Sequence, residues 1–163
     1  MHGKIAILLP YKDQFIKDNA GSASIWVKDF SKDSRYKKNT TVFGFTNSTN
    51  KIFDNFKYIN LKFSKFGIQS NNLQYVNKFI EVLKKKNFSI IEIHNRPSYI
   101  LHIEKYLPNN KYILVIHNNP QSLRGAVTAK DRKKLIKICS KIIFVSNWVK
   151  EKFFEGLDIK NHE

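Results

Sequence analysis

The sequence predicts an α/β fold with a doubly wound, mainly parallel sheet, formed by one domain over residues 1–163. Short apolar runs, each closed by proline or polar turn residues, are typical of buried parallel strands. The last three runs begin at residues 90, 113 and 142, and the intervals of 23 and 29 residues suit strand–helix–strand units. Pro97 suits the start of one crossover helix, and Thr128 with Asp131 forms a capping box for the next.

Six runs are expected to form the strands, over residues 4–9, 40–45, 58–63, 90–93, 113–116 and 142–145. The run at 40–45 alternates, whereas the last three runs are almost entirely apolar, so their strands are expected to be buried on both faces. A first helix is expected over 22–33, with Ile25, Trp26 and Phe30 directed toward the core. Ser70 is expected to cap the helix that leads into the second half of the sheet.

The composition excludes several classes of protein. With 163 residues, of which 42% are hydrophobic and 13% aromatic, the chain can bury a core and is not intrinsically disordered. No apolar run approaches the ~20 residues of a membrane-spanning helix. The single cysteine, Cys139, excludes a disulfide framework and a thiolate zinc site, and it is expected in the core. These features predict a cytoplasmic, soluble domain with no metal and no cofactor.

The net charge of +16 raises the question of an anionic partner. Of the 29 basic residues only four are arginine, whereas base-specific recognition relies on bidentate arginine. No specific nucleic-acid partner is therefore expected. Attraction to an anionic membrane surface remains open, because it needs only lysine-rich faces. The charge alone does not decide between these partners.

Polar residues follow the last three predicted strands. The pattern I-H-N-x-P occurs twice at an offset of 23 residues, as His94-Asn95-Arg96-Pro97 and His117-Asn118-Asn119-Pro120, and Ser146 follows the sixth strand. Ligands of open parallel sheets bind outside the carboxyl ends of the strands. Two imidazoles and three amides on one rim predict a crevice for a polyhydroxylated or phosphorylated ligand.

Each of these residues also has a structural interpretation. Asn95, Asn118 and Asn119 could close turns before proline, and Ser146 could cap a helix. Gly21 precedes a helix, where backbone amides attract phosphate, but neither a dinucleotide fingerprint nor a P-loop is present. No Ser-His-Asp or Cys-His arrangement and no cluster of metal ligands is recognisable.

The chain resembles the amino-terminal domain of family 4 glycosyltransferases of the GT-B architecture, and among them those that build lipopolysaccharide cores. The resemblance rests on KIAILLP (4–10), AGSAS (20–24), IIEIHNRPSYI (90–100), ILVIHNNPQSLRG (113–125) and IIFVSNWVKEKF (142–153). It covers nearly the whole chain, although Ala20 stands where the family usually has a glycine. It implies a Rossmann-like fold that is one half of a GT-B enzyme, with the carboxyl-terminal donor domain absent.

The resemblance also implies roles for individual residues in a retaining sugar transfer of hexosyltransferase type. The loop of Gly21 and Ser22 would bind the donor phosphate, and His117 would contact a hydroxyl of the transferred sugar near its anomeric carbon. The remaining rim residues would bind the acceptor or a sugar: His94, Asn95, Arg96, Asn118, Asn119, Arg124 and Ser146. The nucleotide-sugar donor would bind mainly to the second domain, and the acceptor would be a saccharide or lipid-linked saccharide.

Two other functions remain compatible with the sequence. The chain could be a stand-alone, non-catalytic module that binds a sugar or nucleotide, or a protein that binds polyanions through its charge. In the glycosyltransferase hypothesis, this chain by itself is expected to be inactive. The protein is expected in the cytoplasm, with peripheral contact at the inner face of the membrane.

Overall fold

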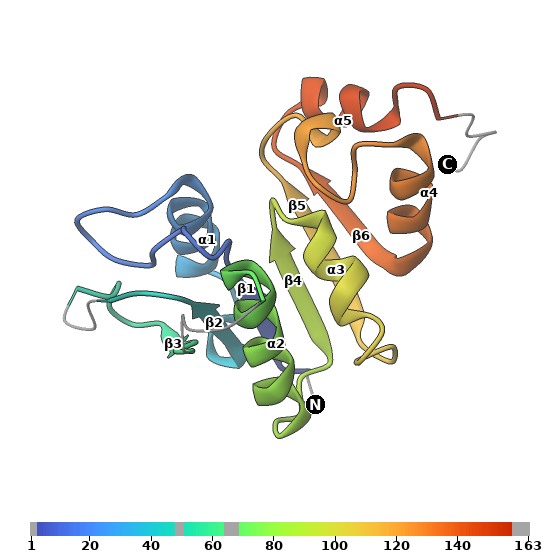
Figure 1. The fold of residues 1–163 in the computed structure, drawn as a ribbon. Coiled ribbons are helices and arrows are strands. Elements are labelled where there is room, and N and C mark those ends of the chain that lie inside the picture. Colours follow the sequence, from blue (N-terminus) through green and yellow to red (C-terminus); the bar gives the residue numbers. More distant parts are fainter. Residues whose placement is uncertain (1–2, 48–50, 64–68, 158–163) are drawn as a thin grey trace.

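The computed structural model describes residues 3–47, 51–63 and 69–157, and it shows a six-stranded sheet with helices on both faces (Figure 1). The strands are β1 (Ile5–Leu8), β2 (Thr40–Gly44), β3 (Lys57–Asn60), β4 (Ile90–His94), β5 (Lys111–Ile116) and β6 (Cys139–Phe144). The helices are α1 (Ser22–Lys32), α2 (Asn71–Lys84), α3 (Pro97–Ile103), α4 (Ala129–Ile138) and α5 (Asn147–Phe154), with 3₁₀ turns at Lys37–Asn39 and Pro120–Ser122.

All neighbouring strands of the sheet are parallel, in the order β3-β2-β1-β4-β5-β6. The predicted doubly wound, Rossmann-like fold is therefore confirmed. The chain moves outward from β1 to β3, returns through α2, and then moves outward in the other direction from β4 to β6. The strand order therefore reverses at the carboxyl ends of β1 and β4, which is the position where ligands generally bind in such sheets.

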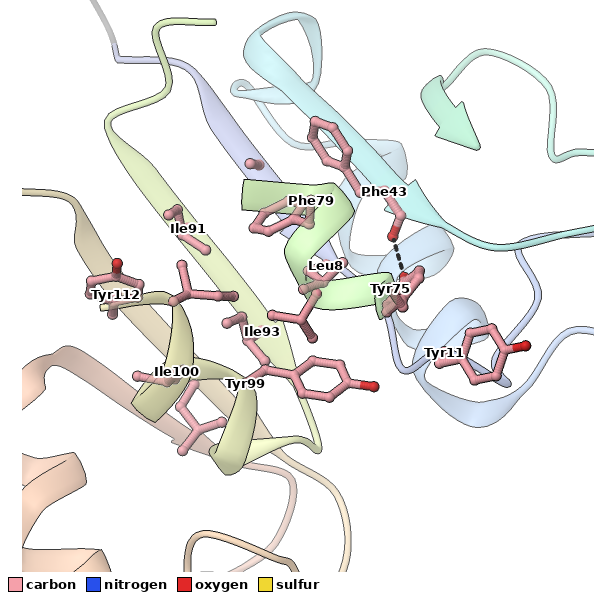
Figure 2. Close-up of a cluster of buried hydrophobic side chains, with 14 of the residues drawn as sticks. Leu8, Tyr11, Phe43, Tyr75, Phe79, Ile91, Ile93, Tyr99, Ile100 and Tyr112 are labelled. Carbon is pink, nitrogen blue, oxygen red and sulfur yellow. Dashed lines mark hydrogen bonds between the residues drawn. The ribbon is translucent and has the colours of Figure 1, made fainter. Parts of the chain in front are cut away.

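The larger part of the core lies between the sheet and α2, α3 and α4 (Figure 2). Leu8, Ile91 and Ile93 point from the strands toward Phe79 and Tyr75 of α2, and all five are buried. The Tyr75 hydroxyl donates to the backbone carbonyl of Leu9 at 2.9 Å, so this buried polar group is satisfied. Fully burying one such apolar side chain stabilises the fold by about 1.5–3 kcal/mol.

The predicted starts of three helices are confirmed. Ser70 accepts a hydrogen bond from the amide of Leu73 at the start of α2. At the start of α4, the Thr128 hydroxyl accepts from the amide of Asp131 at 3.1 Å and donates to its carboxylate at 2.8 Å. Pro97 is the first residue of α3, where its missing N–H costs no helical hydrogen bond.

The predicted inward face of α1 is wrong for Ile25 and Phe30, whereas Trp26 is partly buried and packs against the smaller core cluster. Ile25 and Phe30 are 45% and 66% exposed, whereas Ala23, Ser24 and Val27 are buried. Small side chains on the buried face let the helix start lie close to the loop that follows β1. The side chain of Phe30 instead stacks on Trp26, with ring centroids 4.2 Å apart.

The expectation that the strands are buried on both faces is also wrong for the second half of the sheet. The crossovers α3 and α4 both cover the face that α2 covers, and the opposite face of β4 and β5 is only partly covered. A hollow of about 490 Å³ remains there, and Ile90, Glu92, Ile113 and Trp26 contribute to its lining. Strand ends differ from prediction by up to three residues: β5 begins at Lys111, β6 begins at Cys139, and β3 ends at Asn60.

Candidate functional site

His94 and His117 come together at the carboxyl ends of β4 and β5. His94 is the last residue of β4, and His117 directly follows β5. Nδ1 of His94 lies 3.1 Å from Nε2 of His117, and Nε2 of His94 lies 2.8 Å from a carboxylate oxygen of Glu92. The three side chains form a hydrogen-bonded series that begins on the sheet face and ends at the rim.

The sequence analysis placed both histidines on the rim, but only His117 has exposed surface there. His94 is fully buried, while His117 is partly exposed. Because side chains alternate along a strand, His94 shares the face of Ile90 and Glu92 and lies beside the sheet. Trp26 contacts both imidazoles, with ring centroids 5.1 Å from His94 and 5.9 Å from His117.

This environment keeps His117 neutral. Burial, and to a lesser extent the neighbouring His94, lower the pKa of His117 to about 4, although Asp13 opposes the shift. At neutral pH the imidazole is therefore uncharged, and it can interact with a ligand through a hydrogen bond but not through a positive charge.

The amino terminus of α1 already holds an anion, the carboxylate of Asp13. It accepts hydrogen bonds from the amides of Ala23 and Ser24 at 3.0 and 3.3 Å and from the Ser24 hydroxyl at 2.5 Å. A Cβ atom on Gly21 would lie 2.4 Å from the carboxyl carbon, so a glycine there makes room for Asp13. Donor-phosphate binding by Gly21 and Ser22 stays a prediction, and the two amides bound by Asp13 are not open to it.

Two of the rim asparagines close turns. Asn95 has a φ of +53°, its amide donates to the Val115 carbonyl at 2.8 Å, and its side-chain oxygen accepts from the His117 amide at 3.4 Å. These bonds join the loops that follow β4 and β5. Asn119 accepts from the amide of Gln121 at 3.0 Å. The structural interpretation is thus observed for both residues, while their contacts with a ligand stay predictions.

The remaining rim residues are less constrained or lie elsewhere. Arg96 donates to the carbonyl of Asn95 at 2.8 Å, and Asn118 is exposed. Arg124 lines a separate pocket of about 190 Å³ between α2 and α3, and neither His94 nor His117 contributes to its lining. The Ser146 hydroxyl accepts from the Val149 amide at 3.3 Å and caps α5, so its helix-capping interpretation is observed.

Sequence reasoning missed Glu92 and Asp13. Glu92 interrupts the apolar run of β4, and an acidic residue inside a buried strand was a usable signal for a charged group serving a site. Asp13 could have been suspected because the residue at the helix N-cap, Gly21, has no side chain to cap α1. Cys139 is partly buried at the start of β6, and burial raises the pKa of its thiol to about 12.

Over the described ranges, no three or more His, Cys, Asp or Glu side chains gather closely enough to hold a metal ion. In the same part of the chain, no helix combines the length and apolar character needed to cross a membrane. The site consists of the imidazoles of His94 and His117, the carboxylates of Glu92 and Asp13, and the amides of the rim loops.

The lowered pKa of His117 predicts that acid destabilises the fold. The unfolded state binds a proton near pH 6.5 and the folded state only near pH 4, so the free energy of unfolding should fall as the pH drops between these values, by on the order of 2 kcal/mol. Urea unfolding of the wild type and of His117→Gln across this range checks the prediction. The variant should show a weaker pH dependence, and an unchanged slope would contradict it. Because burial also lowers the pKa of His102, this residue contributes to the slope as well, and His102→Gln measures its share separately.

No family model matches the chain, and no curated protein matches its sequence. Among solved structures, the chain is similar to the Anabaena protein HepE, crystallised in complex with UDP and glucose. The TM-score is 0.62 at 16% identity, over 96% of this chain and 42% of HepE. The chain thus spans less than half the length of that protein. At this identity the similarity shows the fold alone, and it agrees with the Rossmann-like architecture described above.

Proposed function

We propose that this chain is the acceptor-side, amino-terminal domain of a retaining glycosyltransferase of GT-B type. The observation that carries the proposal is the series Glu92–His94–His117, which presents a neutral imidazole at the carboxyl end of β5. The fold similarity to a protein bound to UDP and glucose supports it, because these are the two components of a nucleotide-sugar. The proposed reaction moves a hexose from such a donor to a saccharide or lipid-linked saccharide of lipopolysaccharide type.

In this proposal His117 binds a hydroxyl of the transferred sugar near the anomeric carbon. A neutral imidazole suits that task, since it can accept a hydrogen bond from a hydroxyl without repelling positive charge that develops at the anomeric carbon. The backbone amides of Gly21 and Ser22 would contact the donor phosphate and stabilise the leaving group. Arg96, Asn118 and the more distant Arg124 would bind the acceptor, where guanidinium groups suit phosphate or several hydroxyls.

The proposal includes a second, donor-binding domain, because the chain spans only 42% of HepE. We expect the 163-residue chain to fold but to transfer no sugar, since it supplies one side of the cleft. The measurement incubates the chain and the complete gene product separately with nucleotide-sugars and with lipid-linked saccharides. Transfer by the complete product alone supports the proposal, and turnover by the short chain overturns it. Binding of a nucleotide-sugar without transfer by the complete product would favour a non-catalytic binding module.

We further propose that the protein makes peripheral contact with anionic lipids at the inner face of the cell membrane. There it would reach a lipid-linked acceptor. Five lysines line a hollow of about 460 Å³ at the amino-terminal edge of the sheet: Lys4, Lys38, Lys57, Lys85 and Lys86. The outer face of α4 adds Lys130, Lys133, Lys134 and Lys137. Each lysine near an anionic surface contributes about 1 kcal/mol at low salt.

We expect the chain to co-sediment with phosphatidylserine vesicles at low ionic strength and to dissociate as salt approaches about 0.15 M. Vesicles of phosphatidylcholine alone are the control and should not bind. Charge reversal at Lys85 and Lys86, compared with reversal at Lys133 and Lys134, identifies the face that meets the lipid. No binding to acidic vesicles at low salt would contradict the membrane proposal.

A further inference from the structure

Glu92 lies two residues before His94 on β4. Its carboxylate is the partner of Nε2, the ring nitrogen of His94 that does not contact His117. The Glu92 oxygen and Nε2 of His94 are 2.8 Å apart, and the side chain of His94 has no exposed surface. A neutral imidazole has one nitrogen that donates and one that accepts, and the partner of one nitrogen decides the role of the other. The environment of His94 is therefore decided by protein groups and not by water.

The consequences follow along the series. If the carboxylate accepts from Nε2–H of His94, then Nδ1 of His94 carries a lone pair. A lone pair can only accept a hydrogen bond, and the atom 3.1 Å away is Nε2 of His117. Nε2 of His117 must therefore be protonated and donate to Nδ1 of His94. The remaining nitrogen of His117, Nδ1, is consequently unprotonated and can accept a hydrogen bond.

Nδ1 of His117 is also the nitrogen available to a ligand. Its only side-chain hydrogen bond to the described residues is made through Nε2. The buried polar atoms that lack a partner in the described residues are Tyr58 Oη and Arg132 Nε, so Nδ1 of His117 reaches solvent. Trp26 lies against both rings and holds their orientation.

We propose that Glu92 is a positioning residue, which acts through His94 to make Nδ1 of His117 a dedicated hydrogen-bond acceptor for a ligand hydroxyl. The ligand group at this point must donate a hydrogen bond, which selects a sugar hydroxyl and disfavours a phosphate or carboxylate oxygen. The assignment to a sugar rests on the proposed function. The assignment of the protons rests only on the Glu92–His94–His117 geometry.

The test measures the imidazole nitrogens directly by long-range ¹H–¹⁵N NMR of the 163-residue chain at pH 7, without ligand. The expected result is protonated Nε2 and unprotonated Nδ1 on both His94 and His117. Glu92→Leu removes the acceptor and Glu92→Gln leaves both an acceptor and a donor, so both variants should lose this fixed pattern. Glu104→Gln, which alters a carboxylate at the C-cap of α3, away from His94 and His117, should keep it.

A proton on Nδ1 of His117, a doubly protonated His94, or an unchanged pattern in both Glu92 variants overturns the proposal. Backbone amide spectra of each variant confirm that it is folded, and the wild-type measurement decides the proton positions even if a variant does not fold. Since no sugar takes part, this outcome is independent of the transfer assay. A failed transfer assay with the expected proton pattern would reject the glycosyltransferase and leave the hydroxyl-binding acceptor in place.

Discussion

Replacing His117 with alanine is expected to lower sugar transfer by the complete gene product by about 10²–10³ in kcat, like the loss of one hydrogen bond made mainly in the transition state. The physical reason is that the side chain presents a neutral nitrogen to solvent at the carboxyl end of β5 while its other nitrogen is held by His94. The measurement compares kcat and KM with the melting temperature of the same variant.

A conservative variant separates chemistry from packing. His117→Asn places an amide oxygen near the position of Nδ1, so it should recover part of the transfer that His117→Ala loses. If His117→Ala keeps wild-type turnover, or loses activity only as far as it unfolds, then His117 is a structural loop residue and the proposed role of this rim is rejected.

Gly125→Ala is expected to destabilise the fold by roughly 2–5 kcal/mol, from a strained backbone and from overpacking. Gly125 has a φ of +91°, and a Cβ atom there would lie 2.6 Å from the backbone nitrogen of Ser98. That nitrogen donates to the Arg124 carbonyl at 3.1 Å, so the loop after β5 lies directly on the start of α3. Thermal unfolding should show a melting temperature lower by about 5–15 °C.

Gly156 is a matched control for the strain alone. Its φ is +71°, and a Cβ atom there would meet nothing within 4 Å. Gly156→Ala should therefore cost about 1 kcal/mol, close to the cost of a left-handed conformation for an ordinary residue. Equal effects of the two substitutions would show that the close approach of Gly125 to α3 contributes nothing.

Much of the fold is readable from the sequence because its signals are local. The apolar runs and their spacing predicted the parallel strands, and Ser70, Pro97 and the Thr128–Asp131 pair marked helix starts that the structure confirms. Each of these signals depends on residues within a few positions of one another. The strand ends were predicted less accurately, because pairing partners on other strands decide where a strand stops.

The orientation of α1 was not readable in this way. Helical spacing identified an apolar stripe of Ile25, Trp26 and Phe30, of which only Trp26 packs against the core. The fully buried residues of this helix are Ala23, Ser24 and Val27. The choice depends on Asp13, ten residues from Ala23, which holds the helix start against the loop after β1. A contact between a loop carboxylate and a helix end has no periodicity, and a hydrophobicity pattern therefore does not contain it.

The sequence by itself determined the sheet, its parallel direction and the placement of His94 and His117 at the ends of adjacent strands. Only the tertiary structure decided that His94 lies buried behind His117, with Glu92 as its partner. The physical reason is that alternation along β4 assigns Glu92 and His94 to one face, but the crossovers decide which face is covered. Because α3 and α4 both cover the opposite face, Glu92 and His94 lie on the side where Trp26 of α1 packs. Trp26 also contacts His117, so the site combines residues of α1, β4 and the loop after β5.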